Sequence, residues 1–159
     1  MYKRILVPVD GSDVSTFGLQ EAVRLAKATQ AQLRVMHVVD ELVLFQSGAY
    51  IPRAGEFLEA LTENGKQCLK TAKALAERHG VKAETAIFKT IGDRVAGVIV
   101  KEAKRWRADV VVMGTHGRRG VSHLLLGSDA EAVIKLTPVP VLLVRSQRGT
   151  TKRRTVKRK

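Results

Sequence analysis

The chain has 159 residues, a formal net charge of +13 and a single cysteine, Cys68, and 45% of its residues are hydrophobic. This length fits one domain with its own core, and one cysteine excludes both an internal disulfide and a cysteine-rich zinc site. No stretch reaches the ~20 apolar residues that span a membrane, and the first residues lack the pattern of a signal peptide, so we expect a cytoplasmic protein.

The first half of the chain alternates between predicted strands and predicted helices. Residues 4–9 and 33–39 are short, largely apolar runs rich in β-branched residues and without alternation, a pattern typical of strands buried on both faces. Apolar residues recur every three or four positions in 13–29 and again in 56–79, which predicts amphipathic helices. Gly80 predicts the end of the second helix.

The second half repeats this alternation. Residues 83–88 predict a more polar strand, which suits the edge of a sheet. A helix is expected over 93–106, a continuously apolar strand over 109–113, a shorter helix over 128–136 and a last strand over 139–144.

The order of these elements defines the fold class. Strands and helices that alternate along the chain, joined by right-handed crossovers, predict an α/β fold. We expect an open, doubly wound, five-stranded parallel sheet of order 3-2-1-4-5 with helices on both faces, formed by residues 1–146. Residues 147–159 are a basic tail with almost no apolar content, which predicts disorder.

Two connections are longer than those of ordinary compact domains. They cover residues 40–54 and 114–127, and each follows a predicted strand. Connections above about 12 residues are usually functional or disordered, and in this fold class ligands bind at the carboxyl ends of the strands. Both connections are therefore candidates for a binding site.

The second long connection combines glycines with the start of a helix. Gly114, Gly117 and Gly127 allow backbone amides to approach a ligand closely, and Ser128 opens the last predicted helix. A helix start offers free N–H groups to a phosphate, and Arg118 adds positive charge. The alternative is a glycine-rich surface loop with Ser128 as a plain helix cap.

Asp10 ends the first predicted strand, within the segment Pro8 to Ser12. In the expected sheet the first and fourth strands are neighbours, so this segment and the glycine loop would face one crevice. Asp10 would then accept hydrogen bonds from ribose hydroxyls. The alternative is a turn residue or a cap for the first helix.

These two motifs together resemble those of universal stress proteins of the ATP-binding type. The similarity lies in the spacing Gly114-x2-Gly117-x9-Gly127-Ser128 and in the opening segment from Ile5 to Ser12. It extends over residues 2 to about 146. Two motifs in the correct order are far more specific than either motif alone.

The resemblance implies a nucleotide site and a pairing mode. Val9, Asp10 and Val39 would surround the adenosine, with Val38 as the alternative to Val39 if the strand register differs by one. The other residues implied to line the site or hold the phosphates are Pro8, Ser12, Met113, Gly114, Thr115, His116, Gly117, Arg118, Gly127, Ser128 and Asp129. The ligand would be ATP, with or without Mg²⁺, and a homodimer would form through the last strand, Val139 to Val144.

Two features depart from the family pattern. Asp129 stands where a small or apolar residue is usual, and its carboxylate would repel phosphate unless it points away or shares a divalent cation. The basic tail lies beyond the family domain. It would contact nucleic-acid backbones or an anionic membrane surface, or serve only as a solubilising extension.

Three functions remain open from the sequence. The first is an ATP-binding stress or signalling module, at most a slow ATPase, because no known P-loop, dinucleotide or nucleophile-elbow motif is present. The second is a family member that has lost nucleotide binding and acts through protein partners. The third is association with nucleic acid through the tail.

Overall fold

A computed structural model describes residues 1–42, 53–115 and 126–145 of the chain. Its elements are β1 (Arg4–Pro8), α1 (Asp13–Thr29), β2 (Gln32–Asp40), α3 (Ala54–Arg78), β3 (Ala83–Thr90), α4 (Val95–Arg105), β4 (Val110–Gly114), α5 (Ser128–Leu136) and β5 (Val141–Val144). Every strand and helix expected from the sequence is present, with each boundary within two residues of its prediction. The tail lies outside the described residues.

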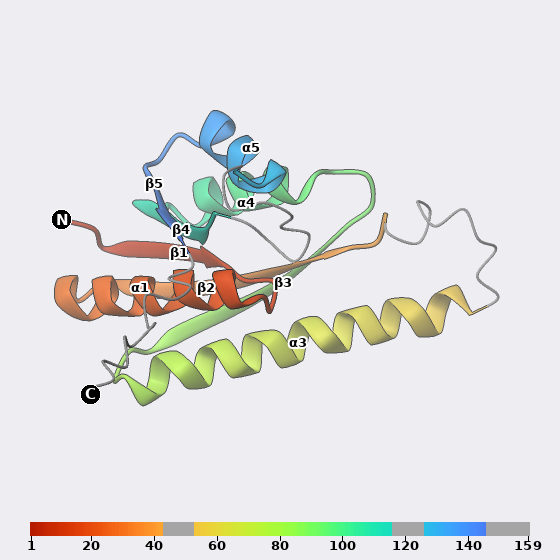
Figure 1. The fold of residues 1–159 in the computed structure, drawn as a ribbon, viewed down its shortest axis with the longest axis horizontal. Coiled ribbons are helices and arrows are strands. Elements are labelled where there is room, and N and C mark those ends of the chain that lie inside the picture. Colours follow the sequence, from red (N-terminus) through yellow and green to blue (C-terminus); the bar gives the residue numbers. More distant parts are fainter. Residues whose placement is uncertain (43–52, 116–125, 146–159) are drawn as a thin grey trace, which may run out of the picture.

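The strands form one parallel sheet of order β3-β2-β1-β4-β5, which confirms the predicted fold class and strand order. Helices α1 and α3 cover one face, and α4 and α5 cover the other (Figure 1). The more polar strand β3 lies at one edge, as its composition predicts, and the short strand β5 lies at the other.

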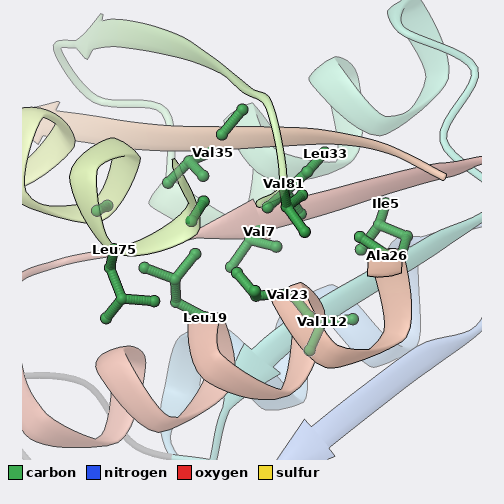
Figure 2. Close-up of a cluster of buried hydrophobic side chains, with 14 of the residues drawn as sticks. Ile5, Val7, Leu19, Val23, Ala26, Leu33, Val35, Leu75, Val81 and Val112 are labelled. Atoms are coloured by element: carbon green, nitrogen blue, oxygen red, sulfur yellow. The ribbon is translucent and has the colours of Figure 1, made fainter. Parts of the chain in front are cut away.

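The core has two halves because side chains of a strand alternate between the faces of the sheet. In β1, Ile5 and Val7 pack with α1 and α3, whereas Leu6 packs with α4 and α5. Figure 2 shows the first half, in which Leu19 and Val23 of α1 lie close to Val7. Full burial of such a side chain contributes about 1.5–3 kcal/mol to stability. The apolar strands therefore stabilise the packing of helices on both faces of the sheet.

Local signals set the ends of the elements. Gly80 has a φ of +77° and donates its N–H to the carbonyl of Glu77, while Val81 donates to Ala76, which is the glycine-ended helix stop expected from the sequence. At the amino ends of the strands, the Asp109 carboxylate accepts hydrogen bonds from the amides of Lys3 and Arg4 at 2.7 and 2.8 Å. The bond from the Lys3 amide is the main reason why the pKa of Asp109 lies below its ordinary value.

Candidate functional site

The carboxyl edge of the sheet brings the two sequence motifs together. Strands β1 and β4 are parallel neighbours, with Ile5 opposite Val110 and Leu6 opposite Val111. The residues that follow β1, Val9 and Asp10, therefore emerge at the same edge as Gly114 and Thr115. The order of the sheet reverses between β1 and β4, and ligands of doubly wound folds bind at such a reversal.

Asp10 forms a turn that leads into α1. Its Oδ1 accepts hydrogen bonds from the backbone N–H of Ser12 at 2.9 Å and from the Ser12 hydroxyl at 2.6 Å. Ser12 is the N-cap of α1, and its Oγ accepts from the amide of Ser15. Between them Gly11 has a φ of +82°, which favours glycine. Asp10 therefore stabilises a turn, which is the alternative expected from the sequence. A hydrogen bond to a ribose would be a second function of the same carboxyl group.

Gly114 has a packing role at the end of β4. A Cβ added there would lie 2.7 Å from Val14 Cγ1 and 2.9 Å from the Val14 carbonyl oxygen. The first turn of α1 thus rests directly on the strand end. The sequence reasoning gave Gly114 only a role toward phosphate and missed this contact.

Gly18 is a second glycine that the sequence reasoning missed. A Cβ at Gly18 would lie 3.1 Å from the amide nitrogen of Gly114, closer than ordinary side-chain contacts. The available signal was a glycine inside the helical pattern of 13–29, where it costs about 1 kcal/mol relative to alanine and so requires a packing reason. Together Gly18 and Gly114 let α1 approach β4 closely.

The start of α5 is tied to the end of β4. Thr115 donates its N–H to Val144 at 3.0 Å, and its carbonyl accepts the N–H of Gly127 at 2.8 Å. Gly127 is the N-cap of α5 and has no side chain that can cap the helix. Ser128 is consequently the first helical residue and not the cap, so the plain-cap alternative for Ser128 is wrong.

The first turn of α5 places backbone N–H groups at a helix start beside a carboxylate, that of Asp129. Amides at the start of a helix lack partners within the helix and attract anions. Ser128 and Asp129 are both exposed there. The acid that departs from the family pattern thus lies in the turn proposed to face phosphate.

The end of β2 completes this edge. Met113 at the end of β4 and Val39 near the end of β2 are buried, and Val38 packs among the apolar residues on the face of α4 and α5. Pro8 lies opposite Met36, so β2 continues beyond the end of β1. Val38 and Val39, the two alternatives for contact with the adenosine, therefore lie in the part of β2 that continues beyond the end of β1.

Part of the predicted site lies outside the described residues, namely His116, Gly117 and Arg118. Within the described ranges, no three histidine, cysteine, aspartate or glutamate side chains are grouped as metal ligands would be. A hollow of about 580 Å³ lies elsewhere, between α3 and β3, lined by residues that include Glu56, Glu63 and Lys89. None of the helices in the described ranges has the length and apolar character needed to cross a membrane.

Fold and edge together define a class of protein: doubly wound α/β domains with a ligand-binding edge at the reversal of strand order. Comparison with known families narrows this class. Residues 1–145 match the universal stress protein family, and the chain belongs to that family.

Individual relatives agree with this assignment. The chain is 38% identical over 148 residues to universal stress protein MJ0531 of Methanocaldococcus jannaschii, covering 91% of this chain and 83% of the relative. The solved structure of protein MJ0577 superposes with a TM-score of 0.79 at 30% identity, covering 94% of this chain and 99% of that one. A universal stress protein solved in complex with cAMP gives a TM-score of 0.59 at 25% identity, covering 91% and 97%.

Proposed function

We propose that the chain is an ATP-binding universal stress protein, a cytoplasmic module whose conformation or assembly responds to bound nucleotide. The observation that carries the proposal is the convergence, at one edge of the sheet, of the Asp10 turn with the start of α5, whose N-cap residue Gly127 has no capping side chain. The relative that was solved with cAMP supports an adenine nucleotide as the ligand. Bound nucleotide stabilises whichever state binds it, by mass action.

The proposed division of the site is the one that the family resemblance implies. Val9, Asp10 and Val39, or Val38 in its place, contact the adenosine, and Asp10 accepts from the ribose hydroxyls. The first amides of α5, at Ser128 and Asp129, receive phosphate together with the glycine connection that precedes them. The chain holds ATP, with or without Mg²⁺, and hydrolyses it slowly at most.

A second candidate function follows from Asp129. A carboxylate in the first turn of α5 opposes phosphate at the same place where the helix attracts it. If this repulsion prevails, the chain is a family member that acts through protein partners without nucleotide. Association of the basic tail with nucleic acid is independent of this choice.

Mass spectrometry of the small molecules released from freshly purified, denatured protein tests the proposal. We expect ATP or ADP, and we expect calorimetry of the stripped protein to give one site that takes ATP. Asp129→Asn should bind ATP more tightly, because it removes a repulsive charge, whereas Glu131→Gln, whose carboxylate pairs with Lys135, is the matched control and should bind as the wild type does.

The outcomes separate the two candidates. No released nucleotide, and no heat of binding with millimolar Mg-ATP, would contradict the proposal. If Asp129→Asn then binds ATP while the wild type and Glu131→Gln do not, the second candidate function is supported, and the Asp129 carboxylate is the cause of the lost nucleotide binding.

A further inference from the structure

His37 makes an unusual contact at the point where β1 ends. The pairing of β1 with β2 runs to Pro8, which lies opposite Met36, and Val9 donates its N–H to the Met36 carbonyl at 2.8 Å. The carbonyl oxygen of Val9 lies 2.8 Å from Nδ1 of His37. Since a carbonyl only accepts, Nδ1 carries the proton and donates. His37 and Val9 are 8% and 6% exposed, so this bond is made away from water.

Helix α3 holds the opposite edge of the same ring. Gly65 is buried, and a Cβ added there would lie 2.6 Å from Cδ2 and 3.1 Å from Nε2 of His37. It would also lie 3.1 Å from Cδ1 of Ile87, which is opposite His37 in β3. A glycine inside a helix costs about 1 kcal/mol relative to alanine, and here it makes room for the imidazole. The ring is thus enclosed by β1, α3 and β3.

The hydrogen bond between His37 and Val9 affects Asp10 because one peptide unit joins Val9 to Asp10. The Val9 carbonyl and the Asp10 N–H belong to one planar group, so fixing the carbonyl fixes the direction of the amide. That amide points to Ser15 Oγ at 3.4 Å, and the Asp10 side chain continues into the Ser12 turn. A buried carbonyl that loses its donor costs more than an ordinary hydrogen bond contributes. The ring therefore sets the orientation of the peptide from which Asp10 leaves the strand.

We propose that His37 is a positioning residue for the nucleotide site: its ring, seated against Gly65, holds the Val9 carbonyl and thereby fixes the turn that carries Asp10. The consequence for ligand affinity rests on the function proposed above. The consequence for the Asp10 turn does not, because it concerns the protein without ligand.

Two substitutions of His37 separate the hydrogen bond from the volume of the ring. Asn places a donor close to the position of Nδ1, whereas Leu fills space and donates nothing. We expect His37→Leu to weaken ATP binding about tenfold, the equivalent of one well-made buried hydrogen bond, and His37→Asn to stay close to the wild type. Val35→Ala is the matched control, because Val35 is buried on the same strand and in the same half of the core but takes no part in the bond between His37 and Val9.

Gly65→Ala tests the same contact from α3. The added methyl group must displace the His37 ring, so ATP binding should fall although alanine is the better helix former. Gly97→Ala in α4 is its control, because a Cβ there meets no atom within 4 Å. Equal affinity in Gly65→Ala and Gly97→Ala would overturn the proposal.

Amide hydrogen exchange without nucleotide provides the independent reading. His37→Leu should speed exchange at Asp10, Ser12 and Ser15 about tenfold over the wild type, while His37→Asn and Val35→Ala leave the ratio between these amides and the rest of the sheet unchanged. This pattern in a protein that binds no nucleotide would refute the proposed function and support the positioning role. Equal exchange in His37→Leu and His37→Asn, or a loss of ATP affinity in Val35→Ala as large as in His37→Leu, would overturn the positioning role.

Discussion

Glu102 carries a charge into the interior of the α4 face. Its side chain is 1% exposed and accepts hydrogen bonds from Arg34 Nη1 at 2.7 Å and from Arg105 Nε at 2.7 Å. The Arg34 guanidinium also lies over the Trp106 ring, 4.7 Å from its centre. A buried carboxylate is tolerated only when it is paired in this way, so these side chains act as one unit that fastens α4 to β2.

Glu102→Ala should lower the free energy of unfolding by about 2–3 kcal/mol, since it removes a fully buried carboxylate that pairs with Arg34 and Arg105, while Arg34 keeps its pairing with the exposed Glu84. Urea unfolding monitored by Trp106 fluorescence measures the change. Glu84→Ala removes the other carboxylate that pairs with Arg34, but Glu84 is 56% exposed and should cost about 1 kcal/mol or less. Similar losses in both variants would contradict the assignment of Glu102 as the buried anchor.

The contacts of individual side chains were the least predictable part of the structure. Sequence reasoning predicted the 93–106 helix but not that Glu102 is buried in it among apolar residues such as Ile99, because its partner Arg34 comes from a strand far away in the sequence. The role of Gly114 toward Val14 was missed for the same reason. Contacts between distant segments depend on packing that a local pattern does not contain.

At the scale of elements, β5 is an edge strand of the described sheet, and it lies beside exposed apolar side chains. It pairs with β4 on one side only, and Leu142 is 39% exposed, with Ile134 and Leu136 of α5 also exposed. A flat apolar edge is a template for pairing with another strand. We therefore propose that the homodimer implied by the family resemblance forms through Val139 to Val144.

Leu142→Lys should convert the dimer to a monomer, because it places a charge at the centre of the proposed interface. Sedimentation velocity across a range of protein concentrations measures the assembly. Ile91→Lys is the control, since Ile91 is 68% exposed after β3, at the opposite side of the sheet, and should leave the dimer intact. A wild-type protein that sediments as a monomer at all concentrations would contradict this interface.

The regular elements were predictable because each has a strong local signal. All strands except the more polar β3 are largely apolar runs, and the helices carry apolar positions at helical spacing, with stops such as Gly80. Their ends shifted where the signal is weaker: β5 begins at Val141 rather than at Val139, after Pro140, whose carbonyl already accepts the N–H of Val111. Proline has no N–H to give to a ladder, so the apolar run alone overestimated the strand.

At the scale of the whole molecule, the strand order creates the edge at which we propose that nucleotide binds. Because β1 lies between β2 and β4, the turn at Asp10 and the end of β4 meet where the connections diverge to opposite faces (Figure 1). The sequence predicted this meeting from crossover rules alone. It did not predict how each residue is used there: Asp10 accepts hydrogen bonds within its own turn, and Gly127, not Ser128, occupies the N-cap position of α5.

Titration of the ¹⁵N-labelled protein with Mg-ATP, followed by amide chemical shifts, tests the central claim most directly. We expect shifts that saturate together with a single dissociation constant at Asp10 to Ser12, at Gly114 and Thr115, and at Gly127 to Asp129. A spectrum unchanged at millimolar Mg-ATP, or shifts confined to the basic residues 147–159, would show that the carboxyl edge of this sheet is not a nucleotide site.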